Sequence, residues 1–258
     1  MSNQAAPLLI SSRDNPLVKE LRLLAQDSTA YRKLGRVWLE GDHLCRAALE
    51  KGQKPAVAVF SESFWPQALV KYSGVATKTV VIPDRLLADI SGLESPAPMG
   101  FVLPLPSLNA ELQPGLASVV LDRLQDAGNV GSVLRSAAAF GFRQVLALKG
   151  SAALWSPKVL RAGMGAHFGL QLVEGLAPEA LAGLQLPLVV TSSHRGEWLH
   201  QQRLPQPCAW VFGHEGQGVS EALEARASHF VRIAQPGGEE SLNVAAAAAI
   251  CLHASATG

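Results

Sequence analysis

Residues 209–218 read AWVFGHEGQG, which is an apolar run followed directly by a loop with three glycines. Residues 233–244 read IAQPGGEESLNV and form a second polar loop, which leads into an alanine-rich segment. Glycine lets a backbone approach a ligand closely and adopt positive φ. Two such loops, each closing an apolar strand, can present several N–H and C=O groups to one ligand. A ligand with an adenine, a ribose and a charged tail would suit them.

The second half of the chain alternates apolar strands with helices. Strands are expected at 117–121, 144–148, 170–173, 188–191, 209–212 and 230–233, and helices near 130–140, 158–164, 178–184, 220–227 and 242–253. Strands that are apolar throughout and alternate with helices predict an α/β fold with a parallel sheet covered on both faces. Ligands of such sheets bind beyond the carboxyl ends of the strands.

The first half predicts a smaller α/β layer. A helix is expected from Asn15, as N-cap, through Ala25, because Pro16 suits the first helical position. Strands at 37–40, 55–60, 78–82 and 100–103 alternate with helices at 41–51, 64–72 and 83–90. Prolines recur from 96 to 114, so we place a linker at 104–114. The expected domains are 1–106 and 115–258.

Composition restricts the class of protein. With 48% hydrophobic and 17% charged residues the chain is globular, and its net charge is +1. Residues 1–54 carry nine Lys/Arg against six Asp/Glu, a surplus that fits either a solvated face or contact with nucleic acid. Cys45, Cys208 and Cys251 form no disulfide or metal pattern and are expected to pack as small apolar groups. With no signal peptide and no membrane span, a cytoplasmic protein is expected.

A strand, a tight turn and a helix run from Leu121 to Ser136. Asn129 is expected to cap that helix, whose N–H groups would favour an anion such as a phosphate. Arg135 could bind the same anion with its guanidinium fork. An ordinary capped helix with Arg135 at the surface is the alternative.

Two further segments carry polar residues. Ser156-Pro157 starts a helix that places Lys158 and Arg161 on one face, which fits either RNA phosphates or solvent. In the glycine loop, Glu215 gains no packing. Ser241 is expected to be the N-cap of the last helix, and Asn243, just inside that cap, is a weak helix former.

Other chemistries fit less well. His194, His200 and His214 with Glu215 match no metal-ligand spacing, so no metal is expected. No GxSxG elbow is present, which disfavours a serine nucleophile. A dinucleotide-dependent dehydrogenase lacks its GxGxxG fingerprint.

Taken in order, these segments resemble the SpoU (TrmH-type) RNA ribose 2′-O-methyltransferases of the SPOUT superfamily. The matches are residues 129–135, 212–220 and 233–245, with 156–158 and 164–166 between them. His214 stands where asparagine is commoner, and Gly163 where serine is commoner. Residues 12–19 and 39–44 are similar to the family's N-terminal RNA-binding domain, which has a ribosomal-protein-like fold.

The resemblance implies a deep trefoil knot in the C-terminal parallel-sheet domain, which would hold S-adenosylmethionine in a bent shape. It also implies a homodimer in which the first-motif residues of one subunit lie near the cofactor of the other. The implied catalytic residues are Asn129, Arg135, Glu215, Ser241 and Asn243. The implied cofactor-binding residues are Thr191, Ser192, Phe212, Gly213, Glu215, Gly216, Gly218, Ile233, Ala234, Ser241, Leu242 and Val244. The implied RNA-binding residues are Arg13, Asn15, Lys19, Arg135, Lys158 and Arg161.

The expected activity is therefore methyl transfer from S-adenosylmethionine to a ribose 2′-OH. A separate N-terminal domain favours ribosomal RNA over transfer RNA as the substrate. A transfer-RNA methyltransferase and a catalytically inactive RNA-binding ribosome-assembly homologue remain the alternatives. We interpret Arg135 as the residue that fixes the target phosphate and polarises the 2′-OH, because a guanidinium with a pKa above ~12 is a poor base.

Overall fold

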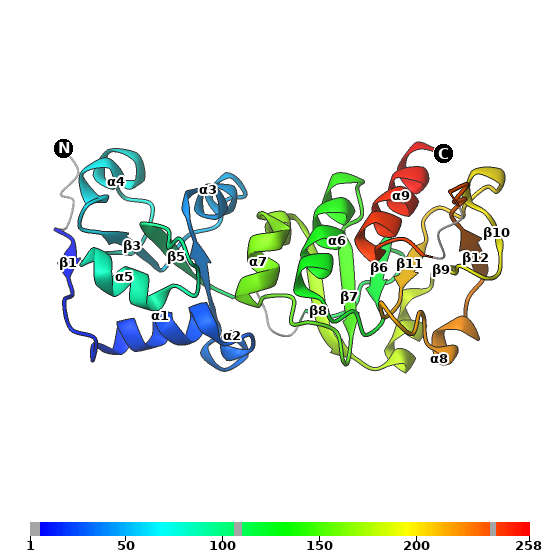
Figure 1. The fold of residues 1–258 in the computed structure, drawn as a ribbon, viewed down its shortest axis with the longest axis horizontal. Coiled ribbons are helices and arrows are strands. Elements are labelled where there is room, and N and C mark those ends of the chain that lie inside the picture. Colours follow the sequence, from blue (N-terminus) through cyan, green and yellow to red (C-terminus); the bar gives the residue numbers. More distant parts are fainter. Residues whose placement is uncertain (1–5, 106–109, 238–240) are drawn as a thin grey trace. The chain divides into compact units, whose positions relative to one another are not determined.

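The computed structural model describes residues 6–105, 110–237 and 241–258. The chain forms two compact units, residues 1–108 with Trp155–Phe168, and residues 109–154 with 169–258 (Figure 1). The segment Trp155–Phe168 thus packs with the first unit, although the sequence placed it inside the second domain. Part of the expected linker, residues 106–109, lies outside the described residues, as does the expected domain end at residue 106.

The first unit contains a mixed five-stranded sheet in the order β1-β4-β3-β5-β2. Strand β5 is antiparallel to β2 and β3, whereas β1, β3 and β4 are parallel. Its strands are β1 (Leu8–Leu9), β2 (Arg36–Glu40), β3 (Val57–Ser61), β4 (Lys78–Ile82) and β5 (Met99–Pro104). Its helices are α1 (Pro16–Gln26), α2 (Ala30–Leu34), α3 (Asp42–Glu50), α4 (Trp65–Tyr72), α5 (Asp84–Ile90) and α7 (Pro157–Gly163), with the 3₁₀ turn η1 (Ala166–Gly169) at its edge.

Two helices of this unit begin as the sequence predicts. The Asn15 side chain accepts a hydrogen bond from the Leu17 N–H, and Pro16 opens α1. The Ser156 hydroxyl likewise accepts from the Val159 N–H at the start of α7. Each cap satisfies a backbone donor that has no partner within its helix.

The second unit contains a seven-stranded sheet in the order β10-β12-β9-β11-β6-β7-β8. Every pairing in it is parallel, which confirms the predicted α/β class. Its strands are β6 (Ser118–Leu121), β7 (Gln144–Leu148), β8 (Gln171–Leu176), β9 (Leu188–Thr191), β10 (Glu197–Trp198), β11 (Ala209–Phe212) and β12 (His229–Arg232). Its helical elements are α6 (Ala127–Ala139), η2 (Pro178–Leu184), η3 (Leu199–Gln201), α8 (Glu221–Glu224) and α9 (Val244–Thr257).

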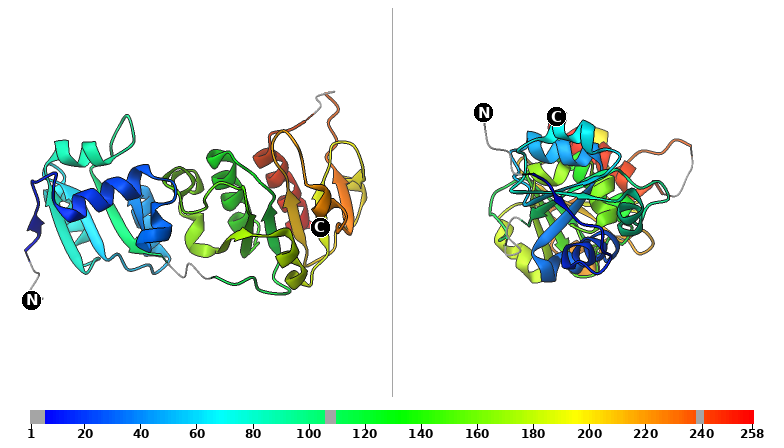
Figure 2. Two further views of the ribbon diagram at one scale, coloured as in Figure 1. Left: turned by 90° about the horizontal axis from the view of Figure 1, so that it is seen from below. Right: turned by 90° about the vertical axis from the view of Figure 1, so that its left-hand side faces the viewer.

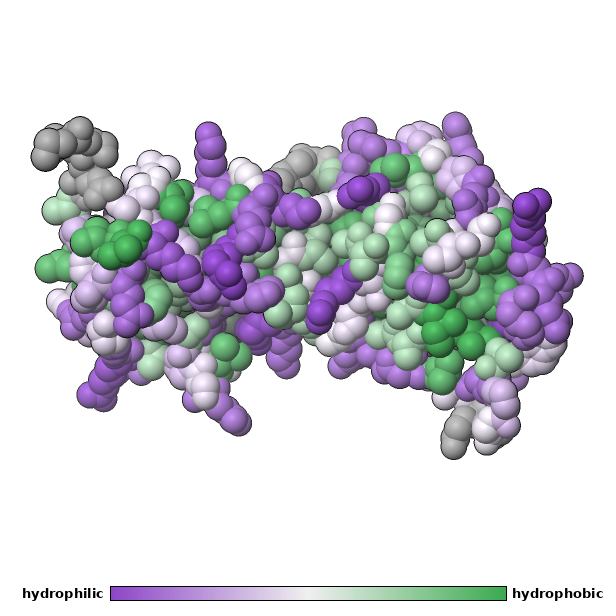
Figure 3. All heavy atoms as spheres, turned by 90° about the horizontal axis from the view of Figure 1, so that it is seen from above, coloured by the Kyte–Doolittle hydropathy of each residue, from purple (hydrophilic) through white to green (hydrophobic). Residues whose placement is uncertain are grey.

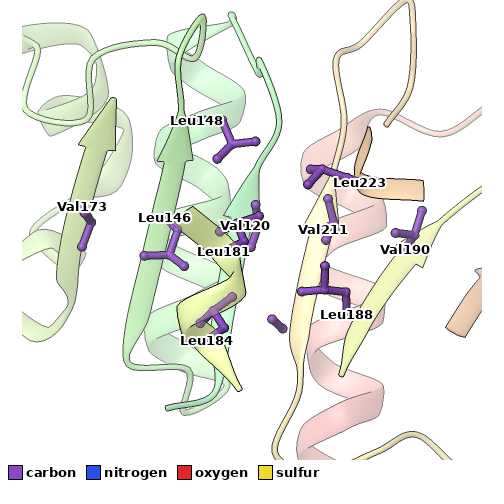
Figure 4. Packing of buried hydrophobic residues seen from close by; sticks show 11 residues of the cluster. Val120, Leu146, Leu148, Val173, Leu181, Leu184, Leu188, Val190, Val211 and Leu223 are labelled. Atoms are coloured by element: carbon purple, nitrogen blue, oxygen red, sulfur yellow. The ribbon is translucent and has the colours of Figure 1, made fainter. Parts of the chain in front are cut away.

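Helical elements cover both faces of this sheet (Figure 2). On one face, Val120, Leu146 and Val211 pack with η2 and α8 through Leu181, Leu184 and Leu223 (Figure 4). On the other face α9 packs against α6 and β11, and the Trp210 indole N–H donates to the Ser255 hydroxyl at 2.7 Å. Burial on both faces explains why the strands are apolar at nearly every position.

Two helix starts differ from the sequence-based expectation. Helix α6 begins at Ala127 with Asp126 as its N-cap, so Asn129 lies inside the helix. Helix α9 begins at Val244 with Asn243 as its N-cap, so Ser241 is not the cap. In both cases a second good capping residue stood close by in the sequence, and tertiary contacts decided which one was used.

Smaller differences concern short elements. Residues 178–184 form a 3₁₀ helix, and α8 is shorter than the expected 220–227. The sequence did not indicate β1, α2 or β10, which are two to five residues long. Such lengths leave too little periodicity to detect.

The three cysteines, Cys45, Cys208 and Cys251, are free and buried, as expected. Burial raises the pKa of the Cys208 thiol to about 11 and that of Cys251 to about 12. None of the helices among the described residues is long and apolar enough to cross a membrane.

Candidate functional site

The predicted motifs meet where the strand order of the second unit reverses. From β6 the chain proceeds outward through β7 and β8, and then crosses to the other side, where β11 pairs with β6. The first motif follows β6 and the glycine loop follows β11, so both lie at the carboxyl ends of neighbouring strands. A crevice at such a switch point is the usual ligand site of an open parallel sheet.

Several of the expected cofactor-binding residues lie at the carboxyl ends of three adjacent strands. Thr191 and Ser192 end β9, Phe212 and Gly213 end β11, and Ile233 and Ala234 follow β12. Strand β9 lies between the other two in the sheet. The Ser192 N–H donates to the Val231 carbonyl at 3.0 Å, which holds the end of β9 against β12.

Three side chains from the three motifs join in one hydrogen-bonded row. Asn129 donates from Nδ2 to Glu215 Oε1 at 3.3 Å, and Asn243 donates from Nδ2 to Asn129 Oδ1 at 3.0 Å. These pairs are 86 and 114 residues apart in the sequence. The fold therefore brings together three of the five residues expected to be catalytic.

The direction of this row is fixed at both ends. Asn243 Oδ1 accepts from the N–H groups of Ala245 and Ala246, so its Nδ2 must face Asn129. At the other end the Glu215 carboxylate can only accept. Each of the two amide groups keeps one further N–H that is not used in the row, and these can donate to a phosphate or ribose oxygen.

Glu215 is held by the start of α6 as well as by Asn129. Its two carboxylate oxygens accept from the N–H of Asp126 at 3.1 Å and, more weakly, from that of Gln125 at 3.4 Å. Partial burial acts to raise the pKa of Glu215, but hydrogen bonds from its own backbone N–H, from the N–H groups of Asp126 and Gln125 and from the Asn129 side chain together lower it below the ordinary value. Glu215 is thus a carboxylate at neutral pH and poorly suited to act as a base.

The glycine loop is closed tightly. A Cβ at Gly213 would lie 2.2 Å from the carbonyl carbon of Gly218, so only glycine fits there. His214 and Gly218 exchange two backbone hydrogen bonds, at 3.0 and 2.8 Å. A Cβ at Gly216, in contrast, would meet only the His214 ring at 3.8 Å, which is an ordinary contact.

Two residues that the sequence did not single out fasten this loop to β6. Asp122 is 2% exposed, and its carboxylate accepts from the Ser220 N–H at 2.6 Å. Arg123 pairs with Asp122 and donates to Gln217 Oε1 at 3.0 Å. A charged pair directly after a buried strand was the available signal, because such positions face the ligand edge of a parallel sheet.

Arg135 is not part of the row. It lies six residues after Asn129 on α6, which places it about 120° around the helix and about 9 Å further along. Its side chain is exposed and makes no hydrogen bond or ion pair with the other described residues. Ser241 and Leu242 are exposed just before α9, and residues 238–240 of the third motif lie outside the described residues.

The expected RNA-binding residues other than Arg135 belong to the first unit. Arg13 pairs with Asp89, and Lys19 pairs with Asp14 at 3.0 Å. Both pairs are exposed, so water screens them and either cation can exchange its partner for a phosphate. Lys158 is exposed on α7 and Arg161 is half-buried there.

No group of three or more His, Cys, Asp or Glu side chains among the described residues could hold a metal ion. His194 is exposed, and His200 lies in η3. The His214 Nδ1 accepts from the N–H groups of Gly216 and Gln217.

Residues 117–253 match the model of the SpoU rRNA methylase family. An uncharacterized tRNA/rRNA methyltransferase of Synechocystis is 31% identical over 95% of this chain and 92% of its own. The 23S rRNA (guanosine(2553)-2′-O)-methyltransferase RlmP of Bacillus subtilis is 28% identical over 95% and 97%. The human mitochondrial rRNA methyltransferase 3 is 36% identical over 58% of this chain, but the match spans only 37% of the human protein.

The fold is also similar to that of a solved TrmH-family protein. The structure from Porphyromonas gingivalis, described as a putative RNA methyltransferase of that family, superposes with a TM-score of 0.81 at 29% identity. The superposition covers 94% of this chain and 97% of the other. Both units therefore have counterparts in one related chain.

Proposed function

The chain belongs to the SpoU rRNA methylase family, and from this premise we propose that it transfers a methyl group from S-adenosylmethionine to a ribose 2′-OH of ribosomal RNA. The row formed by Glu215, Asn129 and Asn243 carries the proposal. It joins the three sequence motifs at the ligand edge of the sheet and leaves amide N–H groups available for a nucleotide.

In the proposed reaction the ribose O2′ would attack the methyl carbon in line, the S–CH3 bond would break, and S-adenosylhomocysteine would leave. The 2′-OH proton would pass to water, since Glu215 is poorly suited to accept it. The site would therefore serve mainly to position the two reactants. Positioning alone can lower such a barrier by several kcal/mol, on the order of 7–11 in favourable cases. Glu215, Asn129 and Asn243 are positioned for this task, and Arg135 supplies a cation for the target phosphate.

The methyl donor would be surrounded by residues of the second and third motifs and of the end of β9. These are Thr191, Ser192, Phe212, Gly213, Glu215, Gly216, Gly218, Ile233, Ala234, Ser241, Leu242 and Val244. Backbone groups at the ends of three adjacent strands support this assignment. A trefoil knot would shape the pocket. In its favour, β11 is inserted between β9 and β6, and after β12 the chain returns to pack α9 against α6.

The variant Gly216→Ala tests whether the glycine loop contacts the methyl donor, without disturbing the fold of the loop. The added methyl group has ordinary room within the chain, so the melting temperature should stay unchanged. If the Gly216 backbone contacts the methyl donor, the same methyl group should raise the KM for S-adenosylmethionine roughly tenfold or more. Steady-state kinetics and thermal melting measure the two effects. Gly213→Ala is the contrasting variant, since it should lower both the melting temperature and the activity. A wild-type KM in Gly216→Ala would contradict the contact.

A homodimer is proposed because α9 is rich in apolar residues and buries only one side, with Cys251 and Leu252 buried and Ile250 exposed. An exposed apolar surface of this kind often marks a contact with another chain. Leu242 and Ile250, which are 38% and 41% exposed, are the large apolar residues exposed among the described part of the second unit, and apolar side chains gather on that surface (Figure 3).

Ile250→Glu should convert the dimer to a monomer without unfolding it, because the side chain already projects from the helix. Sedimentation velocity reports the mass, and circular dichroism reports the fold. Val70→Glu on α4, at an 87% exposed position, is the matched control and should leave the mass unchanged. A monomeric wild-type chain, or a dimeric Ile250→Glu variant, would contradict this interface.

The first unit is proposed to bind the RNA through Arg13, Asn15, Lys19, Lys158 and Arg161. It is also proposed to have a ribosomal-protein-like fold. A hollow along α1, lined in part by Lys19 and Arg22, is consistent with this role. The ribosomal RNA substrate is favoured by the relative from Bacillus subtilis, and work in the cytoplasm is part of the same proposal.

Mapping ribose 2′-O-methyl groups in total RNA with and without the gene tests the function. One ribosomal site should lose its methyl group in the deletion strain and regain it with the purified protein and S-adenosylmethionine. Loss at a transfer-RNA position would instead identify the alternative substrate. An unchanged methylation map, together with failure of the folded protein to bind the donor, would favour an inactive RNA-binding homologue.

A further inference from the structure

The His214 side chain accepts hydrogen bonds from two backbone N–H groups inside the glycine loop. Its Nδ1 lies 3.0 Å from the Gly216 backbone nitrogen and 3.2 Å from that of Gln217, and accepts both hydrogen bonds. A ring nitrogen that accepts a hydrogen bond carries no hydrogen of its own, so Nδ1 presents its lone pair to the loop. The ring is half-buried and faces the loop rather than solvent alone.

These two hydrogen bonds fix the orientation of two peptide groups. In a trans peptide the N–H and the preceding C=O point in opposite directions. Because the Gly216 and Gln217 N–H groups point at the imidazole, the carbonyl oxygens of Glu215 and Gly216 point away from it. The outer side of the loop thus offers acceptors, which suit an amino group or a hydroxyl of a ligand.

The other contacts of the loop act at its ends or outside it. The Asp122 carboxylate accepts from the Ser220 N–H, and Arg123 donates to the Gln217 side chain. The Glu215 carboxylate accepts from the Asp126 N–H at the start of α6. Among the described residues, only His214 makes side-chain hydrogen bonds to the N–H groups of Gly216 and Gln217. The inner part of the loop therefore depends on one acceptor.

We propose that His214 is a positioning residue that orients the Glu215–Gly216 and Gly216–Gln217 peptides for the methyl donor. The inference rests on the proposed function, because that function makes this loop part of the donor site. Loss of the Nδ1 acceptor should therefore weaken donor binding.

Other charged groups near the loop are Asp122 and Arg123 at the end of β6, and Glu215 within the loop. All of them are unchanged in a His214 variant, so a comparison of variants isolates the imidazole. Asparagine is the informative replacement, because its Oδ1 can take the place of Nδ1 as the acceptor. Phenylalanine keeps the ring and removes the acceptor.

The experiment is calorimetric titration of the full-length protein with S-adenosylhomocysteine at about pH 8. His214→Asn should bind like wild type, and His214→Phe roughly tenfold more weakly, because two hydrogen bonds are lost.

A ligand-free measurement covers the case in which His214→Phe misfolds. Long-range ¹⁵N–¹H spectra of wild type at about pH 8 should show no hydrogen on His214 Nδ1, and the amides of Gly216 and Gln217 should be protected from exchange. The same amides should be protected in His214→Asn.

The outcomes are distinguishable. If folded wild type binds no S-adenosylhomocysteine at about pH 8, the proposed function fails, and this inference fails with it. If wild type binds but His214→Phe binds equally well, only the role of His214 is overturned. A His214→Asn variant that binds as weakly as His214→Phe, or a hydrogen on Nδ1, would overturn it as well.

Discussion

Replacing Arg135 by alanine should slow methyl transfer to RNA by about 10²–10³-fold, the usual cost of removing one well-placed donor in a transition state. The exposed Arg135 side chain makes no hydrogen bond or ion pair with the other described residues, so the melting temperature should not change. Binding of S-adenosylmethionine should also be preserved, because Arg135 lies about 120° around α6 from Asn129. Single-turnover methylation with the mapped RNA measures the rate.

Arg143→Ala is the matched control. Arg143 is equally exposed but precedes β7, at the amino end of the sheet, and its loss should leave the rate unchanged. Wild-type turnover in Arg135→Ala would remove Arg135 from the mechanism.

In the proposed homodimer, Arg135 is expected to serve the partner's site. In a heterodimer purified with two tags, one subunit would carry Arg135→Ala and the other Glu215→Ala. If Arg135 acts across the interface, one of the two sites is intact, and about half of the wild-type rate should return. No recovery would mean that Arg135 acts within its own subunit.

Glu215→Ala should lower activity by a factor of about 10² or more, while Glu215→Gln should lose much less. Alanine removes the acceptor for Asp126, Gln125 and Asn129 together. The glutamine oxygen can keep the contacts with Asp126 and Asn129 and gives up the weakest one, at 3.4 Å. A carboxylate that served as the base would instead make both variants equally inactive. Initial rates with saturating donor measure the difference, and Glu221→Ala on α8 is the exposed control.

Glu215 also gives a pH prediction. Its pKa in the folded protein is below the ordinary value of 4.5, so its contribution to stability is complete above that value. The contribution is lost as the pH falls through the lowered pKa. Thermal melting of wild type should thus decline more steeply in acid than melting of Glu215→Gln. Parallel curves for the two proteins would contradict this contribution.

The sequence was informative about the reaction because the motifs are local. The strand at 209–212 was predicted with its observed bounds, since a buried parallel strand is apolar at every position. The chain's family was apparent from the order of three polar segments. Glycines at 213 and 218 indicated a loop in which the backbone turns sharply, and the structure places both at the closure of that loop.

Capping was less predictable, because capping residues stood close together at both helix starts. Asp126 and Asn129 are both good caps, as are Ser241 and Asn243. In the fold Asp126 caps α6, which leaves the Asn129 side chain to bridge Glu215 and Asn243. Local propensity could not make this choice, since it depends on groups 86 and 114 residues away.

The sequence by itself determined the parallel sheet, the loops at its carboxyl edge and the kind of ligand they suit, because periodicity, glycine positions and strand ends are properties of short segments. Only the tertiary structure decided that α7 packs with the first unit, and that Asp122 and His214 shape the glycine loop. These arrangements depend on which distant segments become neighbours, and contacts between distant segments leave no pattern in a single sequence.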